Sequence, residues 1–139
     1  MVLDDIREFM KESFPQAKVE VLSVGDNSST LRQQVDVSHL RPGGTVSGPT
    51  LMGLADAALY VAILGEIGLV ALAVTTNLNI NFLRKPLADR ALLAECRLIK
   101  LGKVLAVGEV TLYSEGQEEP VAHVTGTYSI PPRGDGLSS

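Results

Sequence analysis

Hydrophobic residues recur at helical spacing at the start of the chain and then change to an alternating pattern. Apolar side chains stand every three or four positions through residues 2–14, and a proline ends the run, so an N-terminal helix is expected within residues 1–16. Residues 19–21 and 31–35 read as strands around a turn at residues 25–27. The chain is therefore expected to open with one helix and a hairpin.

A long apolar segment follows a loop at residues 39–44, which is too rich in glycine and proline for regular structure. From Thr50 to about Leu64 the chain is apolar on every side, interrupted chiefly by Asp56 and Tyr60. A surface helix would show a polar stripe, so this helix is expected to be enclosed.

Alternation returns after the apolar helix. Residues 75–83 alternate polar and apolar, as in a half-buried strand, and three more strands are expected near residues 90–100, 103–113 and 120–130. Antiparallel strands on one buried helix make an α+β fold, and the last four strands are expected to form a meander. Residues 131–139 are expected to be a disordered tail of a single domain spanning residues 1–139.

Composition narrows the function classes. A length of 139 residues fits one domain, and a net charge of −4 with 4% aromatic residues disfavours a nucleic-acid partner. One cysteine, Cys96, forms no internal disulfide, which fits a reducing compartment. Two distant histidines and that cysteine offer no metal-ligand cluster, so no metal is expected.

The N-terminus is acidic at Asp4 and Asp5, where a signal peptide would be basic. The segment from Leu51 to Val74 is apolar enough to suggest a membrane span, but it contains Asp56 and Glu66. Each acid would cost roughly 2.5–3.5 kcal/mol at mid-membrane. A cytoplasmic protein with no membrane partner is therefore expected.

The apolar helix opens with Ser47-Gly48-Pro49 and carries one carboxylate, Asp56. Proline suits the first helical position, Ser47 or Gly48 suits the cap, and the free N–H groups there suit an oxyanion. Alternatively, these residues only start a helix. Burying a carboxylate without a partner is costly, so Asp56 either forms a salt bridge or cap with another element or takes part in catalysis.

Spacing constrains how these groups act together. Gly48 and Asp56 are eight residues apart, so a straight helix separates them by about 12 Å. A general base and an oxyanion donor both lie about 3 Å from the reacting carbonyl group. If both groups act, two antiparallel helices across a two-fold axis must bring Gly48 of one chain to Asp56 of the other.

Six motifs follow one another in and around this helix: His39 to Pro49, Leu54-Ala55-Asp56, Ala73 to Arg84, Ala88-Asp89-Arg90, Gly102-Lys103 and Val121 to Thr127. In order and spacing they resemble the motifs of the PaaI-type (phenylacetyl-CoA thioesterase-like) hotdog thioesterases, and the resemblance covers roughly residues 18–130. It implies a hotdog fold, an antiparallel β-sheet wrapped around a long central helix. It also implies a homodimer with two thioester sites at its interface, in some members a dimer of dimers.

The resemblance further implies roles for three residues in an acyl-CoA thioesterase. An acid at the position of Asp56 activates water or attacks the thioester carbonyl. The N–H of Gly48 is the oxyanion donor, and the hydroxyl of Thr75 helps to position the water. No cofactor is implied, since coenzyme A is part of the substrate.

Three departures from the family pattern bear on the substrate. Ser47 stands where the family has a histidine, and Pro49 stands where it has a second glycine. Pro49 has no N–H to donate, so oxyanion stabilisation rests on Gly48, with Thr50 as a possible second donor. Arg41 replaces an asparagine, and it either binds an acidic acyl group or is a solvated loop residue.

Further candidates for substrate binding are apolar or basic. Tyr60 and Phe82, with Leu59 and Ile63, either line an apolar acyl site or fill a core. Residues 84–103 hold six basic and two acidic side chains, beginning with Arg84, a local charge of +4. These side chains either gather into a patch that suits the phosphates of coenzyme A, or point to alternate strand faces as ordinary solvated surface. The expected substrate is a small, medium or aromatic acyl-CoA.

The sequence is also compatible with other functions. Ser47, His39 and Asp56 are the residue types of a serine hydrolase, but the chain lacks the nucleophile elbow. Hydration of an enoyl thioester would require a histidine near the helix, where Ser47 stands. The main alternative is a hotdog dimer that binds an acyl-CoA or similar ligand without turning it over.

Overall fold

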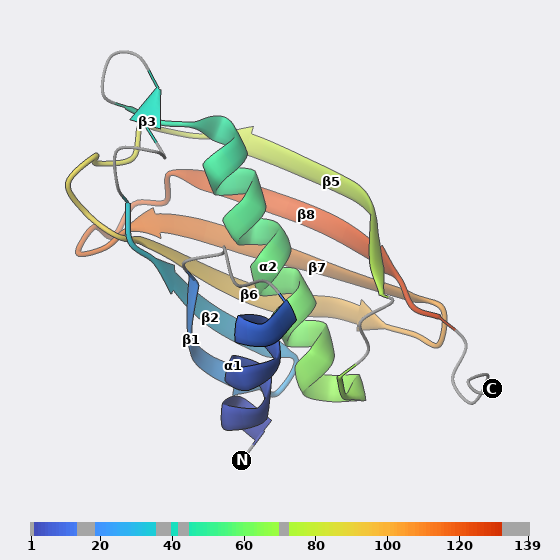
Figure 1. The fold of residues 1–139 in the computed structure, drawn as a ribbon. Coiled ribbons are helices and arrows are strands. Elements are labelled where there is room, and N and C mark those ends of the chain that lie inside the picture. The colour runs from blue at the N-terminus through green and yellow to red at the C-terminus, as the bar shows by residue number, and fades with distance from the viewer. Residues whose placement is uncertain (1, 14–18, 36–39, 42–44, 70–72, 132–139) are drawn as a thin grey trace.

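A six-stranded antiparallel sheet curves around one long helix in the computed structural model, which describes residues 2–13, 19–35, 40–41, 45–69 and 73–131 (Figure 1). The helices are α1 (Val2–Ser13) and α2 (Gly48–Ile67), and the strands are β1 (Val19–Gly25), β2 (Ser28–Gln33), β3 (Leu40–Arg41), β4 (Thr45–Val46), β5 (Val74–Phe82), β6 (Leu92–Leu101), β7 (Leu105–Ser114) and β8 (Ala122–Ser129). This is the expected α+β layout with a long central helix. The tail beyond residue 131 lies outside the described residues.

The strand order in the sheet is β1-β2-β6-β7-β8-β5. β6, β7 and β8 form a meander, but β5 pairs with β8 at the far edge, so the expected four-strand meander is wrong for β5. Among the last four strands, only β7 has both of its neighbours joined to it by short turns. Residues 83–91, which contain a proline, join β5 to β6 across about 14 Å of sheet. An extended segment of this length spans ~30 Å, so it can cross the end of the sheet.

Turn chemistry explains the first hairpin, and one segment that was expected to be a loop contains a short strand. Asp26 and Asn27 have φ values of 53° and 59° between β1 and β2, and both residue types tolerate this left-handed conformation. The segment expected to be irregular, residues 39–44, instead contributes the short strand β3, which pairs with β4. Residues 42–44 lie outside the described part of the chain.

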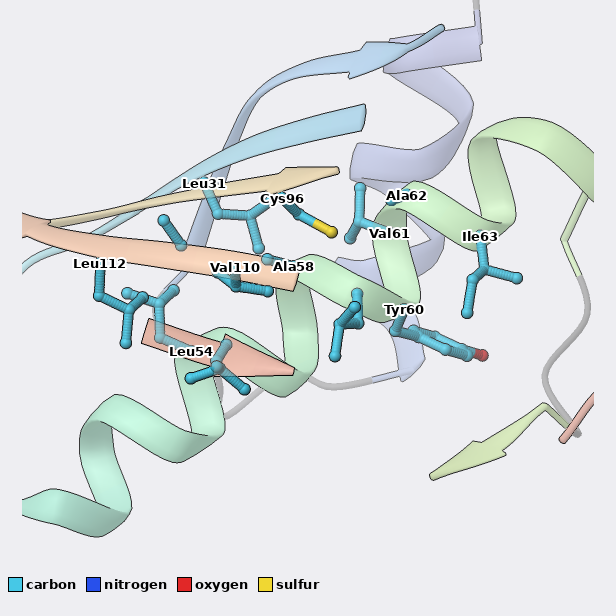
Figure 2. Packing of buried hydrophobic residues seen from close by; sticks show 14 of the residues in the cluster. Leu31, Leu54, Ala58, Tyr60, Val61, Ala62, Ile63, Cys96, Val110 and Leu112 are labelled. Carbon is cyan, nitrogen blue, oxygen red and sulfur yellow. The ribbon is translucent and has the colours of Figure 1, made fainter. Parts of the chain in front are cut away.

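Helix α2 supplies much of the core. Ten of its residues are buried, and they pack with side chains of the inner sheet face such as Leu31, Val110 and Leu112 (Figure 2). Among the described residues α2 is the one helix long and apolar enough to span a membrane, and more than half of the qualifying window is buried. That burial is typical of a core helix.

Two paired glycines let α2 approach the sheet closely. Gly108 of β7 and Gly126 of β8 are register partners beneath Leu59 of α2. A Cβ on Gly108 would lie 2.7 Å from Cδ2 of Leu59 and 3.1 Å from the carbonyl oxygen of Arg97. The glycines therefore set the height of the helix above the strands, and with it the positions of the groups that the helix carries.

We expect Gly108→Ala to lower the free energy of unfolding by about 1–3 kcal/mol, because the backbone of Arg97 cannot yield to the new methyl group. Urea unfolding of the purified protein measures this change. The control is Thr125→Ala on the exposed face of β8, with an expected change within ~0.5 kcal/mol. Equal stabilities of the two variants would contradict the close approach.

Candidate active site

Two hydroxyl groups hold the carboxylate of Asp56 in the middle of α2. Oγ1 of Thr75 and the hydroxyl of Tyr128 each donate to Oδ1 of Asp56 at 2.7 Å. Asp56 is half-buried, and Thr75 is exposed. The sequence singled out Asp56 and Thr75, and the structure brings them together.

Strands β5 and β8 place both donors. Thr75 and Tyr128 are register partners, next to an irregularity of β5 between Thr75 and Asn77. Tyr128 points to the inner sheet face and is 4% exposed. Burial raises the pKa of Tyr128 above its usual range, so its hydroxyl stays protonated and remains a donor. Sequence reasoning missed Tyr128, although its alternation with Val124 in β8 marked it as inward-facing.

The start of α2 is a capped helix N-terminus. Ser47 has extended backbone angles, and its Oγ accepts a hydrogen bond from the N–H of Thr50 at 3.3 Å. Oγ of Ser47 also lies 2.7 Å from Oγ1 of Thr50. Ser47 is thus the cap, Gly48 is the first helical residue, and Pro49 follows at an exposed position. The helix dipole and the free N–H groups favour negative charge here.

A cavity of about 370 Å³ lies beside this N-terminus. Its lining residues are Val46, Gly48, Leu51, Phe82, Leu83, Arg84, Lys85 and Pro86. The ring of Phe82 is 56% exposed and lies so close to Gly48 that a Cβ there would be 3.2 Å from Cζ of Phe82. Nη1 of Arg84 donates to the carbonyl of Pro120, and Nε of Arg84 lies 3.9 Å from Glu119. The cavity therefore joins an apolar ring, a helix N-terminus and two basic side chains.

The remaining predicted residues have other positions. Leu59 and Ile63 are buried in the core, which decides between the two alternatives left open for them. Tyr60 is 6% exposed, and its ring stacks on that of Tyr128 with 6.0 Å between centroids. Arg41 belongs to β3, but its side chain lies outside the described part of the structure, as does His39.

The candidate groups form two clusters on one chain. Gly48, Phe82 and Arg84 surround the cavity, whereas Asp56 and Thr75 lie further along α2. The helical rise between Gly48 and Asp56 amounts to about 12 Å. Within one chain the predicted oxyanion donor at Gly48 and the carboxylate of Asp56 therefore do not reach the same reacting atom.

One stripe of α2 is not covered by its own sheet. Pro49 and Gly53 are exposed, and Met52, Asp56 and Ala57 are half-buried. These positions follow helical spacing, so they share one face. The expectation of a helix enclosed on every side is therefore wrong within one chain, because the sheet curves around only part of the helix. Asp56 lies on this open stripe.

Comparisons with known proteins place the chain among thioesterases. A family model described as the thioesterase superfamily matches residues 43–121. A candidate thioesterase from a Silicibacter species is 48% identical, with a TM-score of 0.86 over 94% of this chain and 92% of that chain. No curated protein matches the chain.

More distant solved structures share the fold. A variant of the phenylacetic acid degradation protein PaaI from Thermus thermophilus is 26% identical, with a TM-score of 0.73 over 89% of this chain and 99% of that chain. Zebrafish thioesterase superfamily member 2 is 23% identical, with a TM-score of 0.83 over 94% of this chain and 99% of that chain. The resemblance to PaaI-type hotdog proteins is confirmed.

We expect Ser47→Ala to lower the free energy of unfolding by about 1 kcal/mol, because the N–H of Thr50 loses its acceptor. Thermal or urea unfolding measures the loss. Ser47→Asp restores an acceptor at the cap and is expected to regain most of the stability. Equal loss in both variants would show that the cap does not stabilise α2.

Proposed function

We propose that this chain, which belongs to the thioesterase superfamily, hydrolyses acyl-CoA thioesters to a free acid and coenzyme A. Asp56 activates the attacking water or attacks the carbonyl itself, and the N–H of Gly48 stabilises the oxyanion. The observation that carries this proposal is the geometry of Asp56. Its carboxylate is fixed by two hydroxyl donors yet lies on the open stripe of α2.

The site is shared between two copies of the chain. Gly48 and Asp56 lie too far apart on one helix to reach the same carbonyl group. Thr75 of β5 contacts Asp56 on the open stripe of α2, so this stripe and the edge strand β5 lie on the same side of the molecule. Among the described strands β5 pairs only with β8, which leaves its other edge free. A two-fold axis there would set both α2 helices antiparallel, Gly48 of one chain against Asp56 of the other. The open stripe of α2 and the free edge of β5 are the two surfaces that support a shared site.

The cavity beside Gly48 suits a thioester with one polar and one apolar end. Arg84 and Lys85 at its rim offer positive charge to the phosphates of coenzyme A. Phe82 and Leu83, both exposed, offer apolar surface to the acyl group. A cavity of this size favours a small, medium or aromatic acyl chain over a long one.

We expect Asp56→Asn to lower kcat for acyl-CoA hydrolysis by about 10²–10⁴-fold, because an amide is neither a base nor a nucleophile. A panel of short, medium, aromatic and hydroxylated acyl-CoAs is assayed by release of the free thiol. The matched control is Asp5→Asn on the exposed face of α1, which removes one carboxylate outside the proposed site.

Two outcomes would contradict this function. An unchanged kcat in Asp56→Asn would remove Asp56 from the mechanism. Measurable binding of acyl-CoAs by the wild type without any turnover would favour a ligand-binding module instead of an enzyme.

We expect active sites to reappear when two inactive variants are mixed. Gly48→Pro removes the N–H donor while keeping a residue that suits the first helical position, and Asp56→Asn removes the carboxylate. When the two variants are refolded together in equal amounts, half of the dimers contain one chain of each. Each mixed dimer has one intact site and one site that lacks both groups. About a quarter of the wild-type activity is therefore expected if each site takes Gly48 and Asp56 from different chains.

The separate variants refolded alone are the controls for this experiment. If the mixture is no more active than the separate variants, then Gly48 and Asp56 act within the same chain, or no shared site forms. A wild type that is monomeric and active at assay concentration would contradict the shared site as well.

A further inference from the structure

The two oxygens of the Asp56 carboxylate have different surroundings. Oδ1 accepts hydrogen bonds from Thr75 and from Tyr128, each at 2.7 Å. Oδ2 accepts none from any residue that the structure describes. Because Asp56 lies on the open stripe of α2, this second oxygen is the one available to a ligand.

We propose that Tyr128 is a positioning residue for Asp56, and that Tyr128 and Thr75 together hold Oδ1 so that Oδ2 is the reacting oxygen. This inference rests on the proposed function and assigns the oxygen that acts in it. Two hydrogen bonds to one oxygen fix the side-chain rotamer of Asp56. Without them, the side chain would be free to rotate on an open helix face.

The ring of Tyr128 is itself held in place. Its centroid lies 6.0 Å from that of Tyr60 at an interplanar angle of 27°, and Tyr60 lies 6.4 Å from Phe9 of α1. Tyr128 is 4% exposed, so this packing leaves little freedom for its hydroxyl. An aromatic row thus runs from α1 through the core to the carboxylate. Phe9 and Tyr128 both lie outside residues 43–121, which the family model matches.

The geometry fits either route open to Asp56. As a base, Oδ2 takes one proton from water while the water oxygen bonds to the carbonyl carbon. The C–S bond then breaks, and the proton passes from Oδ2 to the departing thiolate, which leaves as the thiol. As a nucleophile, Oδ2 bonds to the carbonyl carbon, the thiolate leaves, and water hydrolyses the anhydride formed. In both routes Tyr128 keeps its proton and donates throughout.

Tyr128→Phe tests the inference, because it keeps the buried ring and removes only the hydroxyl. We expect kcat for the best acyl-CoA to fall about tenfold while KM changes less than about twofold, since Asp56 is misplaced but the substrate contacts remain. The matched control is Tyr113→Phe, which removes a phenol hydroxyl from the outer face of β7. Its kcat is expected to equal that of the wild type.

A crystal structure of Tyr128→Phe gives a second readout that needs no activity. We expect the Asp56 carboxylate to leave its wild-type rotamer or to occupy two. An unchanged Asp56 rotamer, or an unchanged kcat in an otherwise active enzyme, would overturn the positioning role. These results differ from failure of the proposed function, in which the wild type hydrolyses no acyl-CoA while its Asp56 still depends on Tyr128.

Discussion

The rigid rise of α2 is the constraint on which the rest of the site depends. The helix carries both Gly48 and Asp56, and the helical rise separates them by about 12 Å. Its height above the sheet is fixed in turn by Leu59 against the glycines of β7 and β8. No local movement within the helix brings the oxyanion site and the carboxylate together. In the proposed function a second chain supplies what one helix cannot, and the uncovered stripe of α2 is the surface proposed for that chain.

The same constraint explains why Asp56 needs its neighbours. A carboxylate on an apolar open stripe has few groups around it to set its direction. Thr75 comes from the edge strand and Tyr128 from the adjacent strand, and they meet at one oxygen. The edge strand therefore has two functions in the proposed site. It offers one hydroxyl to the carboxylate, and its free backbone is available to a second copy.

Much of this arrangement follows from the sequence, and the misses have physical causes. Nearly every helix and strand was predicted from the spacing of apolar residues and from the turn residues, because both are local features of the sequence. The placement of β5 beside β8 did not follow, since a crossing connection leaves no local signal. Asp56 was singled out as the carboxylate in an apolar helix and Gly48 as part of the helix N-terminus, whereas Thr75 was predicted from the family resemblance. Tyr128 was missed because its place beside Thr75 and Asp56 arises from strand pairing between residues 53 positions apart.

The most direct test is a crystal structure of the protein with a non-hydrolysable acyl-CoA analogue. We expect the carbonyl oxygen to lie about 3 Å from the backbone N of Gly48 of one chain. The carbonyl carbon should lie within ~3.5 Å of Oδ2 of Asp56 of the other chain, directly or through one water. A carbonyl group held away from Asp56, or contacted by both groups of a single chain, would contradict the shared thioesterase site.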